Sequence, residues 1–311
     1  MPTAPETVVP FVSDAGDVPQ GVVPRAPEII RLRFLARKMR AEITAMLDGK
    51  TPEESLHLFS NTTANWTAAD FVPNENLWCQ SLRSQLTGVH MYVSGGWMQG
   101  YGLTAITPRH VLSCAHNGPQ GNSNLTVRYV SVTGEVFETH LARWCCDSTS
   151  NAAKVNVPQE PIRADLSVYL LADELPEWVY KAPVIALTDA DRNAMEPYKP
   201  LALAVSQGGW TAGPPASNTP RNRVVYPKRL GWWDYAEGYQ DWYHPPQVGD
   251  SGTPEFVLIG GKLYLYQIIS GGNVWSHIDY IREMIARCDA AAGISTGYVP
   301  ETGNFIFIPN N

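Results

Sequence analysis

The feature that most constrains the fold of this chain is a series of short β-rich runs separated by turn residues. Strands spaced by about 8–12 residues are typical of β-barrels and sandwiches, whereas a parallel sheet would need a helix between successive strands. The sequence therefore predicts an all-β fold. We expect strands at 89–93, 102–106, 111–115, 125–132, 135–142, 166–171, 201–206, 223–227, 255–259 and 263–270.

Two helices are expected to flank these strands. Between Pro27 and Gly49, apolar residues recur every three or four positions, which predicts an amphipathic helix over 27–48. Arginines and a lysine crowd its first half, so it is either a docking helix for an acidic partner or nucleic acid, or a helix with an ordinary solvated face. A second apolar stripe predicts a closing helix over 274–288.

Charge and hydropathy argue against several classes of partner. The formal net charge of −7 over 311 residues is unfavourable for general nucleic-acid binding, and no nucleic-acid partner is expected. No apolar run approaches the ~18 residues of a spanning helix, and the N-terminus lacks the basic and apolar regions of a signal peptide. We therefore expect no membrane association, and a cytoplasmic or assembly-associated location.

Cysteines and histidines show no cofactor pattern. The five cysteines are an odd set without C-x-x-C spacing, and the seven histidines show no metal-ligand spacing. Neither pattern predicts a disulfide framework, a metal or another cofactor.

The sharpest local signal is Gly249-Asp250-Ser251-Gly252, which follows two prolines and precedes a strand pair. Glycines in a tight loop let backbone N–H groups converge on an oxyanion beside a serine nucleophile. The serine needs a base, and the base needs a carboxylate to orient it. His116 and Asp165, each beside an expected strand, are the candidates. Taken singly, each of the three could be structural, but their occurrence together in the order His, Asp, Ser favours catalysis.

These segments resemble those of the trypsin-like (chymotrypsin-fold) serine proteases. Residues 102–116 are similar to the stretch that ends in the family's catalytic histidine, and 165–168 to the segment around its aspartate. Residues 249–254 resemble its nucleophile loop. Gly208-Gly209-Trp210 resembles a turn of its second barrel, and Ser270-Gly271-Gly272 its substrate-binding strand.

The resemblance covers about residues 86–290 and implies two antiparallel β-barrels of trypsin-like type with a C-terminal helix. The implied parts are barrel one at about 86–190, barrel two at about 195–273 and the closing helix at 274–288. A partly helical arm or pro-segment, residues 1–85, would precede them, and a tail, residues 291–311, would follow.

The resemblance also implies roles for individual residues. Ser251 would be the nucleophile, His116 its base, and Asp165 the group that orients the imidazole. The backbone N–H groups of Gly249 and Ser251 would form the oxyanion hole, and Asp250 would hold this loop through a buried ion pair or hydrogen bonds. The implied substrate-binding residues are Pro245, Ser270, Gly271 and Gly272.

Three positions depart from the family pattern. Thr253 stands where a third glycine is usual, and Asn117 stands where secreted members have a cysteine. Pro245 occupies the position of the pocket base, so no carboxylate there favours substrates with arginine or lysine.

The sequence leaves two functions open. The first is a serine endopeptidase acting on protein or peptide substrates, with an esterase as a minor variant. The second is a protease-fold binding or structural protein, part of a larger assembly, with little or no turnover. The sequence also leaves two roles for the arm, residues 1–85. It is either a pro-segment removed near 83–87, or a permanent segment that docks the domain onto a protein partner.

Overall fold

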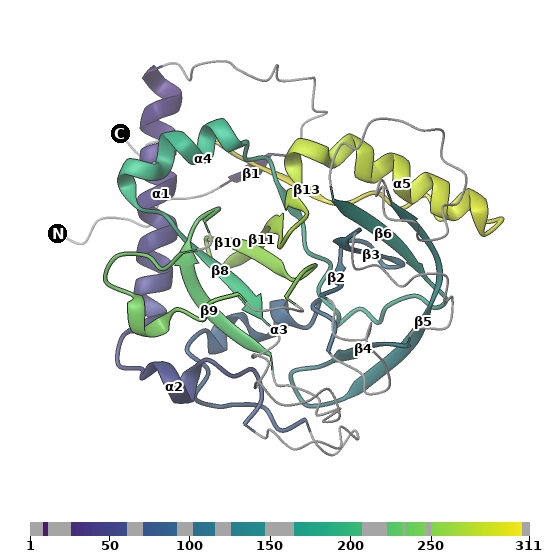
Figure 1. The fold of residues 1–311 in the computed structure, drawn as a ribbon, viewed down its shortest axis with the longest axis horizontal. Coiled ribbons are helices and arrows are strands. Elements are labelled where there is room, and N and C mark those ends of the chain that lie inside the picture. The colour runs from purple at the N-terminus through teal and green to yellow at the C-terminus, as the bar shows by residue number, and fades with distance from the viewer. Residues whose placement is uncertain are drawn as a thin grey trace.

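The computed structural model describes residues 9–11, 26–60, 71–91, 102–115, 126–146, 165–206, 223–232, 234–246 and 250–306. In this part of the chain the fold is mostly β, with two sheets and a helix near the C-terminus (Figure 1). One of the sheets curves into a half-barrel. The β-rich fold with a closing helix, expected from the strand pattern, is therefore present.

The first sheet is antiparallel and has the strand order β2-β3-β6-β5-β4. Its central strands β3 and β6 are buried along their whole length, which explains why their sequences are nearly continuous apolar runs. The strands are β2 (Thr104–Ala105), β3 (His110–Cys114), β4 (Thr126–Val130), β5 (Val136–Cys146) and β6 (Leu166–Leu171).

The second sheet has the order β1-β13-β7-β11-β10-β8-β9, with β12 paired to β11. Strands β8, β10 and β11 form its buried centre, and β9 pairs with β8 along six residues. The strands are β1 (Val9–Phe11), β7 (Val184–Ile185), β8 (Leu201–Ser206), β9 (Val224–Arg229), β10 (Pro254–Ile259), β11 (Lys262–Ile268), β12 (Gly272–Asn273) and β13 (Thr302–Ile306).

Helix α1 follows β1 and precedes the other strands of both sheets, α5 lies near the C-terminus, and α2, α3 and α4 are short helices between them along the chain. None of those in the described residues is both long and apolar enough to cross a membrane. Helix α5 is preceded by a short 3-10 turn, so the closing helix begins a few residues later than expected. The α-helices are α1 (Ala26–Leu47), α2 (Pro52–Ser55), α3 (Arg83–Leu86), α4 (Asp189–Met195) and α5 (Ile278–Ala291).

Helix α1 packs on the second sheet, against β8, β10 and α4 (Figure 1). Its apolar stripe is buried: Leu32, Met39 and Ile43 are each at most 1% exposed. Burying a side chain of this size contributes about 1.5–3 kcal/mol relative to leaving it in water. The helix is therefore part of the hydrophobic core.

The basic half of α1 contacts aromatic rings of the same chain. The guanidinium groups of Arg33 and Arg37 lie 5.6 and 6.0 Å from the centre of the Tyr198 ring, and that of Arg40 lies 5.1 Å from the Tyr239 ring. Arg40 also donates hydrogen bonds to the carbonyls of Lys199 and Glu237. These arginines stabilise the attachment of the helix, in addition to facing solvent.

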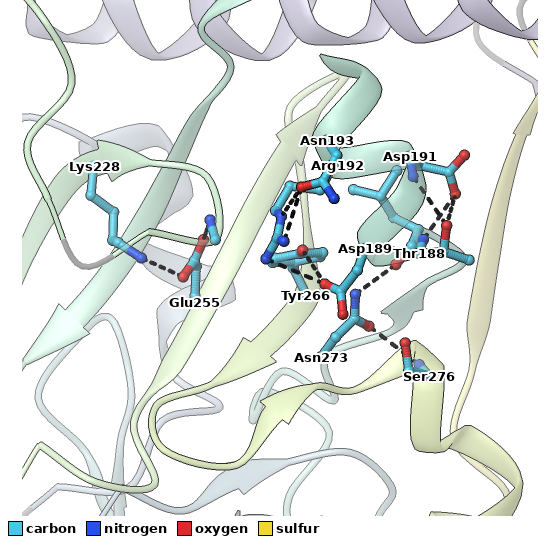
Figure 2. Close-up of polar contacts among 12 residues, drawn as sticks. Thr188, Asp189, Asp191, Arg192, Asn193, Lys228, Glu255, Tyr266, Asn273 and Ser276 are labelled. Carbon is cyan, nitrogen blue, oxygen red and sulfur yellow. Dashed lines mark hydrogen bonds and ion pairs between the residues drawn. The ribbon is translucent and has the colours of Figure 1, made fainter. Parts of the chain in front are cut away.

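A buried ion pair connects two strands of the second sheet. Lys228 of β9 and Glu255 of β10 are 1% and 0% exposed at their side chains, and the Lys228 Nζ donates to Glu255 Oε2 at 2.5 Å. Figure 2 shows the two side chains pointing toward each other. The other carboxylate oxygen accepts from the backbone N–H of Gly231 at 2.7 Å. The charges of both partners are thus compensated, as burial requires.

Helix α4 was not predicted from the sequence. Its N-terminus has a capping box, in which Thr188 accepts from the N–H of Asp191 while the Asp191 carboxylate accepts from the N–H of Thr188. Asn273 stabilises the segment just before this helix by donating a side-chain hydrogen bond to the carbonyl of Leu187 at 2.9 Å (Figure 2). The signal Thr-x-x-Asp was present in the sequence, but the helix is too short to show a periodic apolar stripe.

Strand β13 lies in the segment expected to be a tail. It pairs in parallel with β7 and antiparallel with β1, so residues near both ends of the described chain join the edge of the second sheet. Strand β7 has only two residues, and no local pattern distinguishes so short a strand.

His110 joins the first sheet to the end of α5. Its ring is fully buried, with Nδ1 accepting from Thr107 Oγ1 at 2.8 Å and Nε2 donating to Asp289 Oδ1 at 3.1 Å. Burial lowers the pKa of His110, and the Asp289 carboxylate opposes this only in part. Burial would raise the pKa of Asp289, but the hydrogen bonds from Thr296 and the contact with His110 lower it.

We expect the protein to lose stability as the pH falls from about 7 to 5. A histidine with a lowered pKa binds a proton less readily in the folded state, so its contribution is complete above the unfolded value of about 6.5 and is lost below it. His57 and His244 act in the same direction because burial lowers their pKa values too. Urea unfolding at several pH values would measure the slope, and His110→Asn should reduce it. An unchanged slope in the variant would contradict this assignment.

Candidate active site

Most of the predicted site residues lie within the described part of the chain. Asp165, Asp250 and Ser251 are described, as are the four residues expected to bind substrate. His116 and Gly249 lie outside the described residues. Their chain neighbours Ala115 and Asp250 are described, and they locate the ends of the two predicted segments.

Asp165 lies next to the residue that precedes His116. Strands β3 and β6 pair antiparallel, with Cys114 opposite Leu166, so the end of one strand meets the start of the other. The backbone N–H of Ala115 donates both to the Asp165 carboxylate, 3.0 Å from Oδ1, and to the Asp165 carbonyl at 3.1 Å. The sheet register therefore places the candidate carboxylate beside the chain that leads into the candidate base.

The loop of Ser251 packs on the same strand of the first sheet. Gly252 has φ of +87°, and a Cβ at this position would lie 2.2 Å from Ser113 Oγ and 2.7 Å from the Gly102 carbonyl oxygen. Only glycine combines this backbone conformation with so close an approach. The N–H of Gly102 also approaches the Ser251 carbonyl oxygen, at 3.4 Å. The nucleophile loop, which leads into the second sheet, thus touches β3 near its exit toward residue 116.

The predicted substrate-binding strand lies between these two segments. Ser270 Oγ is 3.3 Å from Ser251 Oγ, and a Cβ on Gly271 would lie 3.0 Å from the Asp165 carbonyl oxygen. The N–H of Gly252 donates to the Ile269 carbonyl at 2.9 Å. Asp165, Ser251, Ser270 and Gly271 are therefore brought together, although they are far apart in sequence. Gly272 follows them at the start of β12.

Asp250 is a buried residue, 1% exposed, directly before the candidate nucleophile. The hydroxyl of Ser206, at the end of β8, lies 2.9 Å from both of its carboxylate oxygens. Its carbonyl accepts from the N–H of Thr253 at 3.0 Å and from the Thr253 hydroxyl at 2.6 Å. The threonine that departs from the family pattern thus closes the turn around Ser251, a task that glycine could perform only through its backbone.

The expected pocket-base residue, Pro245, is exposed, while the neighbouring His244 is half-buried. The His244 ring packs edge-on against the buried Tyr226 ring, with centroids 5.8 Å apart. Burial lowers the pKa of His244, and the nearby Asp250 carboxylate counteracts it. The His244 and Tyr226 rings therefore lie beside this position.

Sequence reasoning missed two residues near Asp250. Ser206 lies at the end of the apolar run Leu201–Ser206, where a terminal serine attracts no attention. Arg223 directly precedes the apolar start of β9 and is 0% exposed. Arg223 is the first residue of the strand expected at 223–227, and a charged residue in such a strand was the one available signal, because it needs a compensating group when buried.

Comparison of the sequence with models of known protein families and with characterised proteins found no match.

Proposed function

We propose that this chain is a serine hydrolase of the trypsin-like class, with its two sheets corresponding to the two barrels of that class. More particularly, we propose a serine endopeptidase that cleaves peptide bonds by acyl transfer through Ser251. The observation that carries the proposal is the convergence of three sequence segments: the end of β3, the Asp165 carboxylate and the loop of Ser251.

The proposed mechanism assigns one task to each group. Ser251 attacks the substrate carbonyl while His116 removes its proton, and His116 later protonates the leaving amine. Asp165 orients the imidazole and stabilises its charged form. The backbone N–H groups of Gly249 and Ser251 stabilise the oxyanion, and loss of one such donor typically lowers the rate about 10²–10³-fold. Residues Ser270–Gly272 would pair with the substrate backbone as an added strand.

Intact-mass analysis with a fluorophosphonate probe tests this proposal. We expect one adduct per wild-type chain, because only an activated serine reacts rapidly with this reagent. The Ser251→Ala variant should form none. Ser270→Ala is the matched control: it removes the hydroxyl 3.3 Å from Ser251 Oγ and should still be labelled on Ser251.

The alternative function, a binding or structural protein without turnover, predicts the opposite result. No adduct on folded wild-type chain between pH 7 and 8 would contradict the hydrolase proposal and favour this alternative. An adduct that persists in Ser251→Ala would show that another residue is the nucleophile.

A further inference from the structure

We propose that Arg223 is a positioning residue that supplies a permanent counter-charge for Asp250 and thereby holds the loop of Ser251 ready to react without cleavage of the chain. The inference rests on the proposed function of Ser251. It adds that the N-terminal region, in its described residues 26–60 and 71–91, stays attached to the chain because it holds Arg223 in place.

Arg223 is completely buried, and its guanidinium is only partly satisfied. Its Nε and Nη2 donate to the backbone carbonyl of His90, at 3.1 and 2.6 Å. Its Nη1 is buried without a hydrogen-bond partner in the part of the chain that the structure describes. A buried cation costs several kcal/mol unless an anion compensates it. The arrangement therefore calls for a negative group nearby.

Asp250 is that group. Val224, which directly follows Arg223, lies opposite Ser206 in the pairing of β8 with β9, and the Ser206 hydroxyl donates to the Asp250 carboxylate. Burial lowers the pKa of Arg223 to about 10, and the Asp250 carboxylate limits the decrease. The guanidinium thus remains charged at neutral pH. Because Asp250 is itself 1% exposed, each charge offsets the desolvation of the other, and Ser206 fixes the carboxylate by a hydrogen bond to both oxygens.

The N-terminal region holds Arg223 from two sides. The N–H of Leu58 donates to the Arg223 carbonyl at 2.9 Å, and the N–H of Val225 donates to the Leu56 carbonyl at 2.8 Å, so residues 56–58 extend the edge of the second sheet beside β9. His90, whose carbonyl binds the guanidinium, belongs to the part of this region that joins the first sheet through a bridge between Met91 and Arg128. The region therefore covers an edge of each sheet.

Most of the position suggested for removal of this region is buried. Arg83, Leu86 and Thr87 are 8%, 1% and 6% exposed, and Arg83 forms an ion pair with Glu75. A protease needs several residues of extended, accessible chain, which this helical segment does not offer. Cleavage here would also separate Leu56 and Leu58, whose backbone groups pair with Val225 and Arg223, from the rest of the chain. Both observations favour an arm that stays attached.

A double-mutant cycle on Arg223 and Asp250 tests the inference. Arg223→Met should lower the fluorophosphonate labelling rate about 10²–10³-fold, the effect of a displaced oxyanion donor. In an Asp250→Asn background, where no carboxylate needs compensation, the same substitution should lower the rate less than about threefold further. Fold-changes that simply multiply would overturn the proposal, because they would show that the two residues act independently.

Two further variants keep the test decisive. Arg223→Lys retains the charge and should keep at least about a tenth of the wild-type rate, whereas a purely structural role of the guanidinium would make it as slow as Arg223→Met. If Arg223→Met does not fold, Ser206→Ala provides the second measurement. It removes the hydroxyl that donates to the Asp250 carboxylate and should slow labelling about tenfold. Cooperative thermal unfolding of this variant would show that it is folded. An unchanged rate would overturn the role of this network.

The buried pair Lys228 and Glu255 supplies the matched control. It joins the same strand β9 to β10 (Figure 2), and the double variant Lys228→Met/Glu255→Gln removes both charges together. If the two sites act independently, the fold-change of this variant and that of Asp250→Asn should multiply when the substitutions are combined.

The double-mutant cycle on Arg223 and Asp250 is also measured by urea unfolding, because coupling between the two positions in the free energy of unfolding can be detected without activity. Absence of labelling in the wild type would contradict the hydrolase proposal, whereas absence of coupling in unfolding would contradict this one.

Discussion

Replacing Asp165 by asparagine is expected to slow the reaction of Ser251 with a fluorophosphonate about ten-thousand-fold at pH 7. The amide has nearly the shape of the carboxylate, but it stabilises the wrong tautomer of the imidazole and does not offset the positive charge that develops on it. The backbone N–H of Ala115 can still donate to the remaining side-chain oxygen of residue 165, so the local fold should persist. The rate is measured by stopping the labelling reaction at several times and determining the labelled fraction of the chain by intact mass.

Asp173 offers the matched control for this substitution. It follows the same strand β6 at its other end, where its carboxylate accepts a hydrogen bond from Thr139 Oγ1 at 2.9 Å. Asp173→Asn should change the labelling rate less than about twofold. Equal rates in Asp165→Asn and the wild type would remove Asp165 from the proposed mechanism.

Replacing Ile43 by aspartate is expected to lower the free energy of unfolding by more than about 4 kcal/mol. Ile43 is 0% exposed in the core formed between α1 and the sheets. The substitution removes a large apolar side chain and buries an unpaired carboxylate, two effects that each cost several kcal/mol. Urea unfolding followed by tryptophan fluorescence would measure the loss, and the chain carries ten tryptophans as reporters.

Ala45→Asp is the control for the helix itself. Ala45 lies two residues further along α1 on its exposed side, so this substitution places the same carboxylate in solvent. Its cost should stay within about 0.5–1 kcal/mol, since aspartate forms helices less readily than alanine. Similar small losses in both variants would mean that α1 is not part of the cooperative unit, and would favour a detachable arm.

Tight integration of α1 also bears on the partner expected for the arm. Three of the arginines that suggested a docking surface lie over Tyr198 and Tyr239 of the same chain. A docking role for the arm on another protein remains a proposal, and its test is whether Arg33→Glu and Arg37→Glu weaken an assembly or only the fold.

The elements best predicted from the sequence are those with long, regular patterns. The expected helix over 27–48 lies at Ala26–Leu47, and the expected strands at 166–171 and 201–206 have the same bounds in the structure. Strand β7, strand β13 and helix α4 were missed. They are short or lie at an edge, where pairing with a distant segment, and not the local pattern, decides the conformation.

The same division applies to the candidate site. Local chemistry singled out Ser251 and Asp165, because a glycine-rich turn and an acid before an apolar strand are visible in the sequence alone. Their proximity to Ser113, Ala115 and Ser270 depends on the register of β3 with β6 and on the packing of Gly252. No pattern along the chain encodes these contacts.

By itself, then, the sequence determined the β-rich class of the fold and the amphipathic helices, and it singled out the residues proposed for acyl transfer, since each depends on neighbours within a few positions. Only the tertiary structure decided that α1 belongs to the core and that Arg223 lies near Asp250. Both depend on contacts between residues far apart in sequence, whose free energy comes from burial and from charges brought together in a medium of low dielectric constant.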